Sequence, residues 1–277
     1  MSEYVHTVGS DEQARIARFL RVFAVGVVLF VLLMITLFIT ADRWLKLISI
    51  ESERRFIEPY IDLLVESEWL DADPVLQAYV NDITQEINAT LDNSWDDDFE
   101  LRVYVIESEL INAFATLGGY IFVFDGIVDA VDDENSLAMV LGHEVAHVHH
   151  RDPLLGTGRG MLIQLAISAL SGNGIDPSAA NVSSEVILMS YSRDQELAAD
   201  EVALQLLHER YGHVGGATTL FEIIDDDAES YELEALLSTH PDTNARIERM
   251  QELTAEYGWA RREPVPYPDA VRSALQD

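Results

Sequence analysis

The stretch that decides the fold is LAMVLGHEVAHV, residues 137–148, which contains the motif HEVAH at residues 143–147. Apolar residues recur at helical spacing from Asp132 to Arg151, so we expect one helix here, capped by Asp132 or Asp133. Two histidines four residues apart project from one helix face and can bind the same zinc ion. Glu144 is then placed beside a water on that ion. The apolar frame favours burial of the motif over a charged helix whose histidines face solvent.

A catalytic zinc ion needs a third protein ligand and one open position for water. The chain has no cysteine, so the ligand must be His, Asp or Glu. Pro153 stands where the metzincin pattern would have its third histidine, which excludes that class. The better candidate is Glu196, with Asp200 four residues on, in the segment SRDQELAAD at 192–200.

On one helix face Glu196 can reach the metal, while Asp200 accepts a hydrogen bond from a ligating imidazole and so fixes its tautomer. The alternative for this pair is an exposed acidic helix face, which is common in an acidic protein. Flanking alanines, which allow close approach to the HEVAH helix, and the zinc half-site upstream favour the metal site.

An apolar run, VFAVGVVLFVLLMITLFIT, occupies residues 22–40. Its nineteen residues at ~1.5 Å each reach ~28 Å, close to the thickness of a bilayer core. We therefore predict a single transmembrane helix. A cleaved signal peptide is the alternative, but its apolar region would be shorter and would end in small residues, whereas this run is followed by Asp42, Arg43 and Trp44.

Orientation of this helix is not decided by counting basic residues. Three arginines precede the run closely and four basic residues follow it: Arg15, Arg18 and Arg21, then Arg43, Lys46, Arg54 and Arg55. A short tail with an arginine at the membrane edge is hard to translocate. We therefore expect the tail inside the cell and the zinc-binding domain on the extracytoplasmic, periplasmic side.

The net charge of the chain excludes further classes of protein. Lys and Arg number 17 against 49 Asp and Glu, a net charge of 17 − 49 = −32, and this makes nucleic acid an unsuitable partner because phosphates are bound through clustered basic residues. A hydrophobic content of 48% excludes a disordered acidic chain. Lys46 is the only lysine, and the excess of carboxylates predicts a protein adapted to high salt.

Periodicity along the remaining chain predicts a mainly helical α+β domain with a small β-sheet. Helices are expected over Leu45–Leu70, from a cap at Asp73-Pro74 to about Leu91, over Glu185–Arg210 and over Thr243–Glu256; strands over Phe99–Val105 and Tyr120–Phe124; and an acidic loop over Asp92–Asp98. We divide the chain into an N-terminal tail (1–21), the transmembrane helix (22–40), a helical membrane-proximal segment (41–98), a zinc-binding domain (99–257) and a C-terminal tail (258–277).

Four ordered segments resemble a known family: NAFATLGGYIFV at 112–123, GHEVAH at 142–147, RDQELAAD at 193–200, and STHPD with RI at 238–247. The sequence is similar to the gluzincin-type zinc metalloendopeptidases that include the CAAX prenyl endopeptidase, the HtpX membrane proteases and the periplasmic quality-control proteases. The resemblance covers about Leu101 to Met250 and implies a zincin-like metalloprotease fold.

By chemistry and by this resemblance, three residues hold one zinc ion per chain: His143, His147 and Glu196. Glu144 is then the general base for the water and later hands the proton to the leaving amine. Two further residues are candidates for stabilising the oxyanion, His240 and Arg246. His240 has two alternative roles: it could bind zinc and block the resting site, or it could form a plain helix-ending turn with Pro241. Arg246 could instead be a structural partner of Asp200 or of another buried carboxylate.

In a zincin, the segment from Gly118 to Phe124 would supply the edge strand to which an extended substrate adds its backbone, with the contacts at Gly119, Tyr120, Ile121 and Phe122. The apolar segment Leu154 to Ser171 is interrupted by glycines and Arg159, and its unbroken part is too short to cross a bilayer. It is either a lid or membrane-resting helix near the site or a helix packed in the core.

These observations predict a membrane-anchored zinc metalloendopeptidase that acts on polypeptides, in quality control of misfolded or unassembled membrane or envelope proteins. The alternatives are a chaperone-like protein that keeps the fold without turnover and a processing protease with a dedicated substrate. Retention of Glu144 disfavours the first. A CAAX-type prenyl protease would need several membrane spans, and the sequence predicts one.

Overall fold

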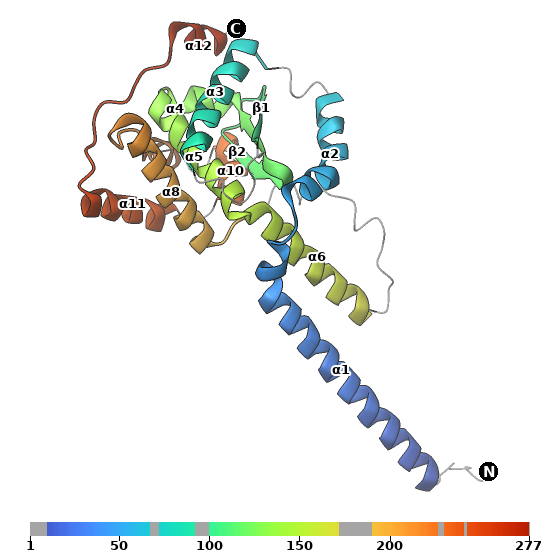
Figure 1. Ribbon diagram of the computed structural model, residues 1–277. Coiled ribbons are helices and arrows are strands. Elements are labelled where there is room, and N and C mark those ends of the chain that lie inside the picture. Colours follow the sequence, from blue (N-terminus) through green and yellow to red (C-terminus); the bar gives the residue numbers. More distant parts are fainter. Residues whose placement is uncertain are drawn as a thin grey trace, which may run out of the picture.

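The computed structural model describes residues 10–66, 72–91, 100–171, 190–226, 230–240 and 243–276 (Figure 1). Over these residues the chain is mainly helical with one small sheet and an apolar N-terminal helix, which confirms the predicted fold class. The predicted acidic loop at 92–98 and the first part of the helix predicted from Glu185 lie outside the described residues.

The first helix, α1 (Ser10–Leu45), contains the whole predicted span and extends beyond it at both ends. Among the described residues it is the one helix long and apolar enough to cross a membrane. It projects away from the rest of the molecule, and its apolar side chains are largely exposed (Figure 1). A short turn joins it to α2 (Ile50–Glu66).

The next helix, α3 (Pro74–Thr90), begins where the sequence predicts. The Asp73 carboxylate accepts hydrogen bonds from the backbone N–H groups of Val75, at 2.7 Å, and Leu76, and Pro74 takes the first helical position, which needs no donor. The helix buries one apolar face, formed by Leu76, Val80, Ile83 and Ile87.

Three strands form the sheet: β1 (Arg102–Ile106), β2 (Ala113–Thr116) and β3 (Tyr120–Phe124). Their order is β1-β3-β2, with β1 parallel and β2 antiparallel to β3. The segment from Gly119 to Phe122 therefore does not form an edge strand, and that prediction is wrong. The parallel partner β1 takes the side of β3 that an edge strand would leave free, and the continuous apolar run YIFVF is typical of a strand buried on both faces.

A glycine turn, the 3₁₀ segment η1 (Leu117–Gly119), connects β2 to β3. Gly118 has φ 75°, and a Cβ there would lie 2.7 Å from Cγ of Arg54 in α2. The Gly118 N–H donates to Glu53 at 2.8 Å, and its carbonyl accepts from Arg54 at 2.8 Å. Paired glycines are thus needed both for the turn and for the close approach of α2.

The zinc-motif helix is α5 (Glu134–His150), capped by Asp133, whose carboxylate accepts the Ser136 N–H at 2.7 Å. It lies in the centre of the molecule, and each position from Asn135 to Val148 is buried. The other elements are α4 (Asp125–Val131), α6 (Asp152–Ser171), α8 (Arg193–Tyr211), α9 (Thr219–Asp226), η3 (Tyr231–Leu233), α10 (Glu234–Thr239), α11 (Thr243–Tyr257) and α12 (Asp269–Ala274).

Helices α5 and α8 pack closely, as the alanine-flanked segment predicts. A Cβ at Gly142 would lie 3.4 Å from Cα of Ala203, so small residues on both helices bring the two backbones together. Helix α8 begins with a capping box, in which Ser192 and Gln195 satisfy each other's backbone N–H groups. This fixes the start of α8 one turn before Glu196.

Candidate metal centre

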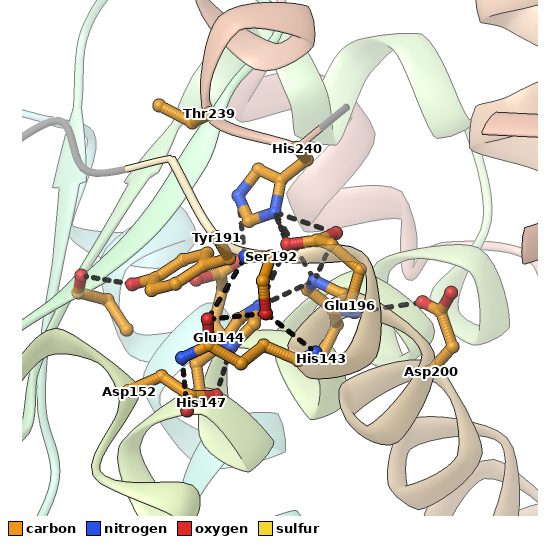
Figure 2. Close-up of polar contacts among 12 residues, drawn as sticks. His143, Glu144, His147, Asp152, Tyr191, Ser192, Glu196, Asp200, Thr239 and His240 are labelled. Atoms are coloured by element: carbon orange, nitrogen blue, oxygen red, sulfur yellow. Dashed lines mark hydrogen bonds and ion pairs between the residues drawn. The ribbon is translucent and has the colours of Figure 1, made fainter. Parts of the chain in front are cut away.

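Four side chains from three helices converge on one buried point (Figure 2). His143 and His147 come from α5, Glu196 from α8, and His240 from the end of α10. One ligand atom from each lies within 4.8 Å of the others. All four residues are at most 6% exposed, so the site is shielded from bulk water.

The predicted ligand atoms point at one another. Nε2 of His143 lies 3.0 Å from Nε2 of His147, and the Glu196 carboxylate oxygens lie 3.5 Å and 3.4 Å from these two nitrogens. Two imidazoles and one carboxylate form a donor set of catalytic zinc sites. Because three groups with lone pairs converge here, a shared cation fits the arrangement, and zinc is the cofactor.

Two aspartates fix which nitrogen of each histidine is free. Nδ1 of His143 lies 2.9 Å from Asp200, and Nδ1 of His147 lies 2.8 Å from Asp152. When each Nδ1–H donates to its carboxylate, each Nε2 presents a lone pair to the metal. Asp200 was expected to orient one of the ligating imidazoles, and the imidazole that it contacts is that of His143.

Asp152 is a residue that the sequence reasoning missed. It follows His147 by five positions, beyond the helical i, i+4 spacing, and reaches back because Arg151 ends α5 in the left-handed region with φ 64°. Gln195 donates to the other oxygen of Asp152 at 2.6 Å, so the carboxylate is held from two sides. An aspartate at a helix start just after a zinc motif is the one sequence signal that could have identified it.

The electrostatics of the site favour a cation. Burial alone would lower the pKa of His143, but hydrogen bonds to Asp200 and Glu196 outweigh it and raise the pKa to about 10. Burial opposes ionisation of Glu196, yet hydrogen bonds from the histidines hold its pKa well below the ordinary range. The negative potential of these carboxylates therefore stabilises positive charge between the imidazoles.

Arg246, from α11, lies on the far side of the two carboxylates. Its Nε and Nη2 each lie 2.7 Å from an oxygen of Asp200, and its Nη1 lies 2.6 Å from Glu196. The side chain is buried, with 6% exposure. Of the two roles considered for Arg246, this geometry matches the partner of buried carboxylates, because its nitrogens already face Asp200 and Glu196.

His240 lies beside the predicted base, Glu144. Its Nδ1 is 3.0 Å from Glu196, and its Nε2 is 3.6 Å from Oε1 of Glu144. Among the described residues, neither Nε2 of His240 nor Oε2 of Glu144 has a hydrogen-bond partner, although both atoms are buried. These two atoms therefore keep unused hydrogen-bonding capacity inside the site, and the same imidazole lies within reach of a metal.

Tyr191 is the second residue missed at the sequence level. Its ring stacks on His147 with centroids 3.9 Å apart and planes 18° apart, and its hydroxyl donates to the Ala115 carbonyl at 3.2 Å (Figure 2). Its backbone N–H donates to Thr239 at 3.3 Å. Tyr191 therefore connects a zinc ligand with β2 and with the residue before His240, and nothing in its local sequence indicates this.

A cleft opens beside the metal centre. Its polar wall includes His143, Glu144 and His240. The rest of its lining is mostly apolar: Ala113, Met139, Val140, Ala217, Leu220, Phe221, Ile224 and Leu236. Ala113 places β2 at this cleft, so the sheet edge nearest the site is β2 and not the strand expected from the sequence.

Fold and site together fit one class, the zinc metallopeptidases with an HExxH helix, and Glu196 lies where a third ligand would be expected. The sequence pattern of Peptidase family M48 matches residues 73–254, and the chain belongs to this family. This confirms the expected family resemblance.

Three relatives illustrate the similarity. The chain is 30% identical to the mitochondrial metalloendopeptidase OMA1 of Schizosaccharomyces pombe over 64% of this chain and 53% of that protein. It is 27% identical to the beta-barrel assembly-enhancing protease of Escherichia coli K12, over 72% and 43% respectively. It is 29% identical to the protease HtpX homolog of Sulfurovum, over 54% and 68%. The chain thus spans about half the length of the first two relatives.

Proposed function

We propose that this chain is a membrane-anchored zinc metalloendopeptidase that cleaves misfolded or unassembled membrane and envelope polypeptides. The observation that carries the proposal is the buried set of His143, His147 and Glu196, with Glu144 beside it and an apolar cleft opening from it. A chaperone-like protein needs no such arrangement of base and metal ligands.

In this mechanism, bound zinc supplies Lewis-acid polarisation of a water and of the scissile carbonyl. Glu144 takes the proton of the attacking water and passes it to the leaving amine. When its imidazole carries both protons, His240 donates through Nδ1 to Glu196 and can donate through Nε2, which faces Glu144, to the developing oxyanion. Arg246 and Asp200 act through the ligands, because they hold Glu196 and His143 in position.

Substrate binding in this proposal uses the edge of β2. The Ala115 carbonyl accepts the hydroxyl of Tyr191, so the outer edge of β2 faces the ligand His147. An extended chain that adds to this edge is recognised through its main chain, which is permissive in sequence. The apolar cleft then takes a bulky apolar side chain. Unfolded segments offer both features, whereas folded proteins bury them.

The cellular setting is inferred from α1 and from the relatives. One of them is named as a beta-barrel assembly-enhancing protease, and this name supports a role in the assembly of other proteins. We infer that the zinc site lies on the extracytoplasmic side, because Arg15, Arg18 and Arg21 of α1 directly precede the apolar run 22–40. A C-terminal reporter active only in the cytoplasm would reverse this orientation.

The test of the function compares zinc content and casein cleavage in the parent and in Glu144→Gln. We expect turnover to fall by about 10²–10⁴-fold in the variant, because a general base is lost, while zinc content stays unchanged. Glu201→Gln, an exposed carboxylate on α8, is the matched control and should cleave like the parent. Equal turnover in parent and Glu144→Gln, or none in the zinc-loaded parent, would end the protease proposal.

A further inference from the structure

Helix α6 leaves the globular part beside α1, and the two helices run along each other (Figure 1). An ion pair joins them: the Arg159 guanidinium binds both oxygens of Asp42, at 2.7 Å and 2.8 Å. At the residue directly before Arg159, a Cβ on Gly158 would lie 2.5 Å from Leu45, which follows Asp42 by about one turn of α1, so the helices approach closely at this glycine. Asp42 follows the predicted span 22–40 by two residues, so this contact marks the membrane edge.

Residues of lower exposure continue from this edge into the span on α1 and along α6. On α1 one line of buried and partly buried residues has a member every three or four positions: Phe30, Met34, Leu37, Ala41 and Leu45. On α6 the corresponding residues are Leu155, Arg159, Leu162 and Ala166. Phe30 lies eleven residues before Ala41, about 16 Å along α1 and well inside the span. A helix that packs on these residues of α1 lies in the same lipid environment as the predicted span.

The far half of α6 is too short to cross. From Gly160 to Ser171 it has twelve residues and no charge, about 18 Å against a bilayer core of about 30 Å. Two of its large apolar side chains, Met161 and Ile163, are 47% and 48% exposed. Side chains of this kind beside a membrane span are covered by acyl chains.

We propose that α6 from Gly160 onward is a half-membrane helix, which lies in the leaflet nearest the zinc site and packs on α1, with lipid covering Met161 and Ile163. Continuity with the predicted span argues for lipid as the occupant of this surface. Of the two structures considered for residues 154–171, the membrane-resting helix is therefore the one we favour. The chain is anchored by two helices, of which one crosses.

This placement brings the zinc site close to the bilayer. Helix α6 begins at Asp152, which holds His147, and Arg159 at the membrane edge follows seven residues later, about 11 Å along the helix. Segments within reach of the site are then those that emerge from the same leaflet. This consequence for substrate choice rests on the proposed function, whereas the insertion of α6 does not.

The test uses the absence of cysteine from the chain. Single cysteines replace Ile163 in α6, Leu33 in α1 and Glu252 in α11, and each carries an environment-sensitive NBD fluorophore. The full chain is reconstituted into phosphatidylcholine–phosphatidylglycerol vesicles that contain lipids with a quenching nitroxide at acyl carbon 5 or 12. Leu33 is the reference inside the bilayer and Glu252 the reference in water.

We expect quenching at Ile163 to exceed that at Glu252 by at least about twofold, because the acyl region excludes the aqueous domain. The shallow nitroxide should quench Ile163 better than the deep one, and Leu33 should show the reverse preference. Quenching at Ile163 equal to that at Glu252 would overturn the proposal. A second outcome would also overturn the proposal: the label at position 163 is blue-shifted but not quenched, and its emission depends on the protein-to-lipid ratio. In that case a second copy of the chain would cover the helix. Neither result depends on proteolysis.

Discussion

At the residue scale, the candidate metal ligands are supported by a surrounding shell of charged and polar side chains. His143 and His147 are each oriented by an aspartate, and those aspartates are held in turn by Arg246 and Gln195. A ligand geometry supported in this way is preorganised, so the loss of one supporting residue is transmitted to the metal without removing a ligand.

Asp152→Asn tests this support directly. Asparagine cannot accept the Nδ1–H of His147 as a carboxylate does, so we expect zinc affinity to fall by about 10–100-fold while the fold is retained. The measurement is zinc content after dialysis against a competing chelator. Asp194→Asn, an exposed carboxylate on α8, is the control and should keep its zinc. Equal retention of zinc in both variants would show that Asp152 does not orient His147.

Arg246→Ala tests the other side of the site. It leaves the buried Asp200 and Glu196 without their cation, and we expect a loss of about 3–5 kcal/mol in the free energy of unfolding. Arg249→Ala, on the same helix but exposed, removes surface pairs with Glu201 and Glu252 and should cost less than about 1 kcal/mol. Urea denaturation in detergent micelles compares the two. Similar losses would contradict a buried structural role for Arg246.

Residue-level prediction from the sequence succeeded where the pattern is local. The i, i+4 spacing placed His143 with His147, and the N-cap preference identified Asp73 and one of the two aspartates before α5. The contact of Asp152 with His147 was not predicted, because Arg151, in the left-handed region, interrupts the helix between these two residues. No spacing rule carries over such a turn.

At the element scale, the sheet shows that strand order could not be predicted from local sequence. The segment Tyr120–Phe124 was identified as a strand, but its position between β1 and β2 depends on a parallel partner that lies eighteen residues earlier in register. The edge beside the zinc site belongs to β2, a strand of four residues that is too short to show a clear alternation. The proposed substrate-binding edge therefore follows from the strand order and not from strand propensity.

The packing of α6 on α1 gives a prediction at this scale. Gly158→Leu places a side chain where Leu45 already lies, so we expect the two helices to separate and the melting temperature in micelles to fall. Gly160→Leu is the matched control, because a Cβ there meets nothing within 4 Å, and it should melt at or above the parent temperature. If both variants melt alike, the contact between α1 and α6 does not stabilise the protein.

At the scale of the whole molecule, the charge of −32 must be tolerated by a compact acidic surface. Self-repulsion among carboxylates weakens as salt shortens the screening length from about 10 Å at 0.1 M to about 3 Å at 1 M. We expect the melting temperature to rise by several degrees between 0.1 M and 2 M KCl. Glucose at matched osmolality is the control for non-ionic effects. Stability and activity that fall steadily as salt is raised would contradict adaptation to high salt.

The sequence by itself determined the features that depend on neighbours in the chain: the zinc half-site, the apolar run of α1 and the helix starts at Asp73 and Asp133. These follow from periodicity, run length and capping, which act within one or two helical turns. Only the tertiary structure decided the central position of β3, the support of His147 by Asp152 and Tyr191, and the alignment of α6 with α1. Each of these depends on a contact between segments whose meeting is set by the packing of the whole chain, and local physical rules do not contain that information.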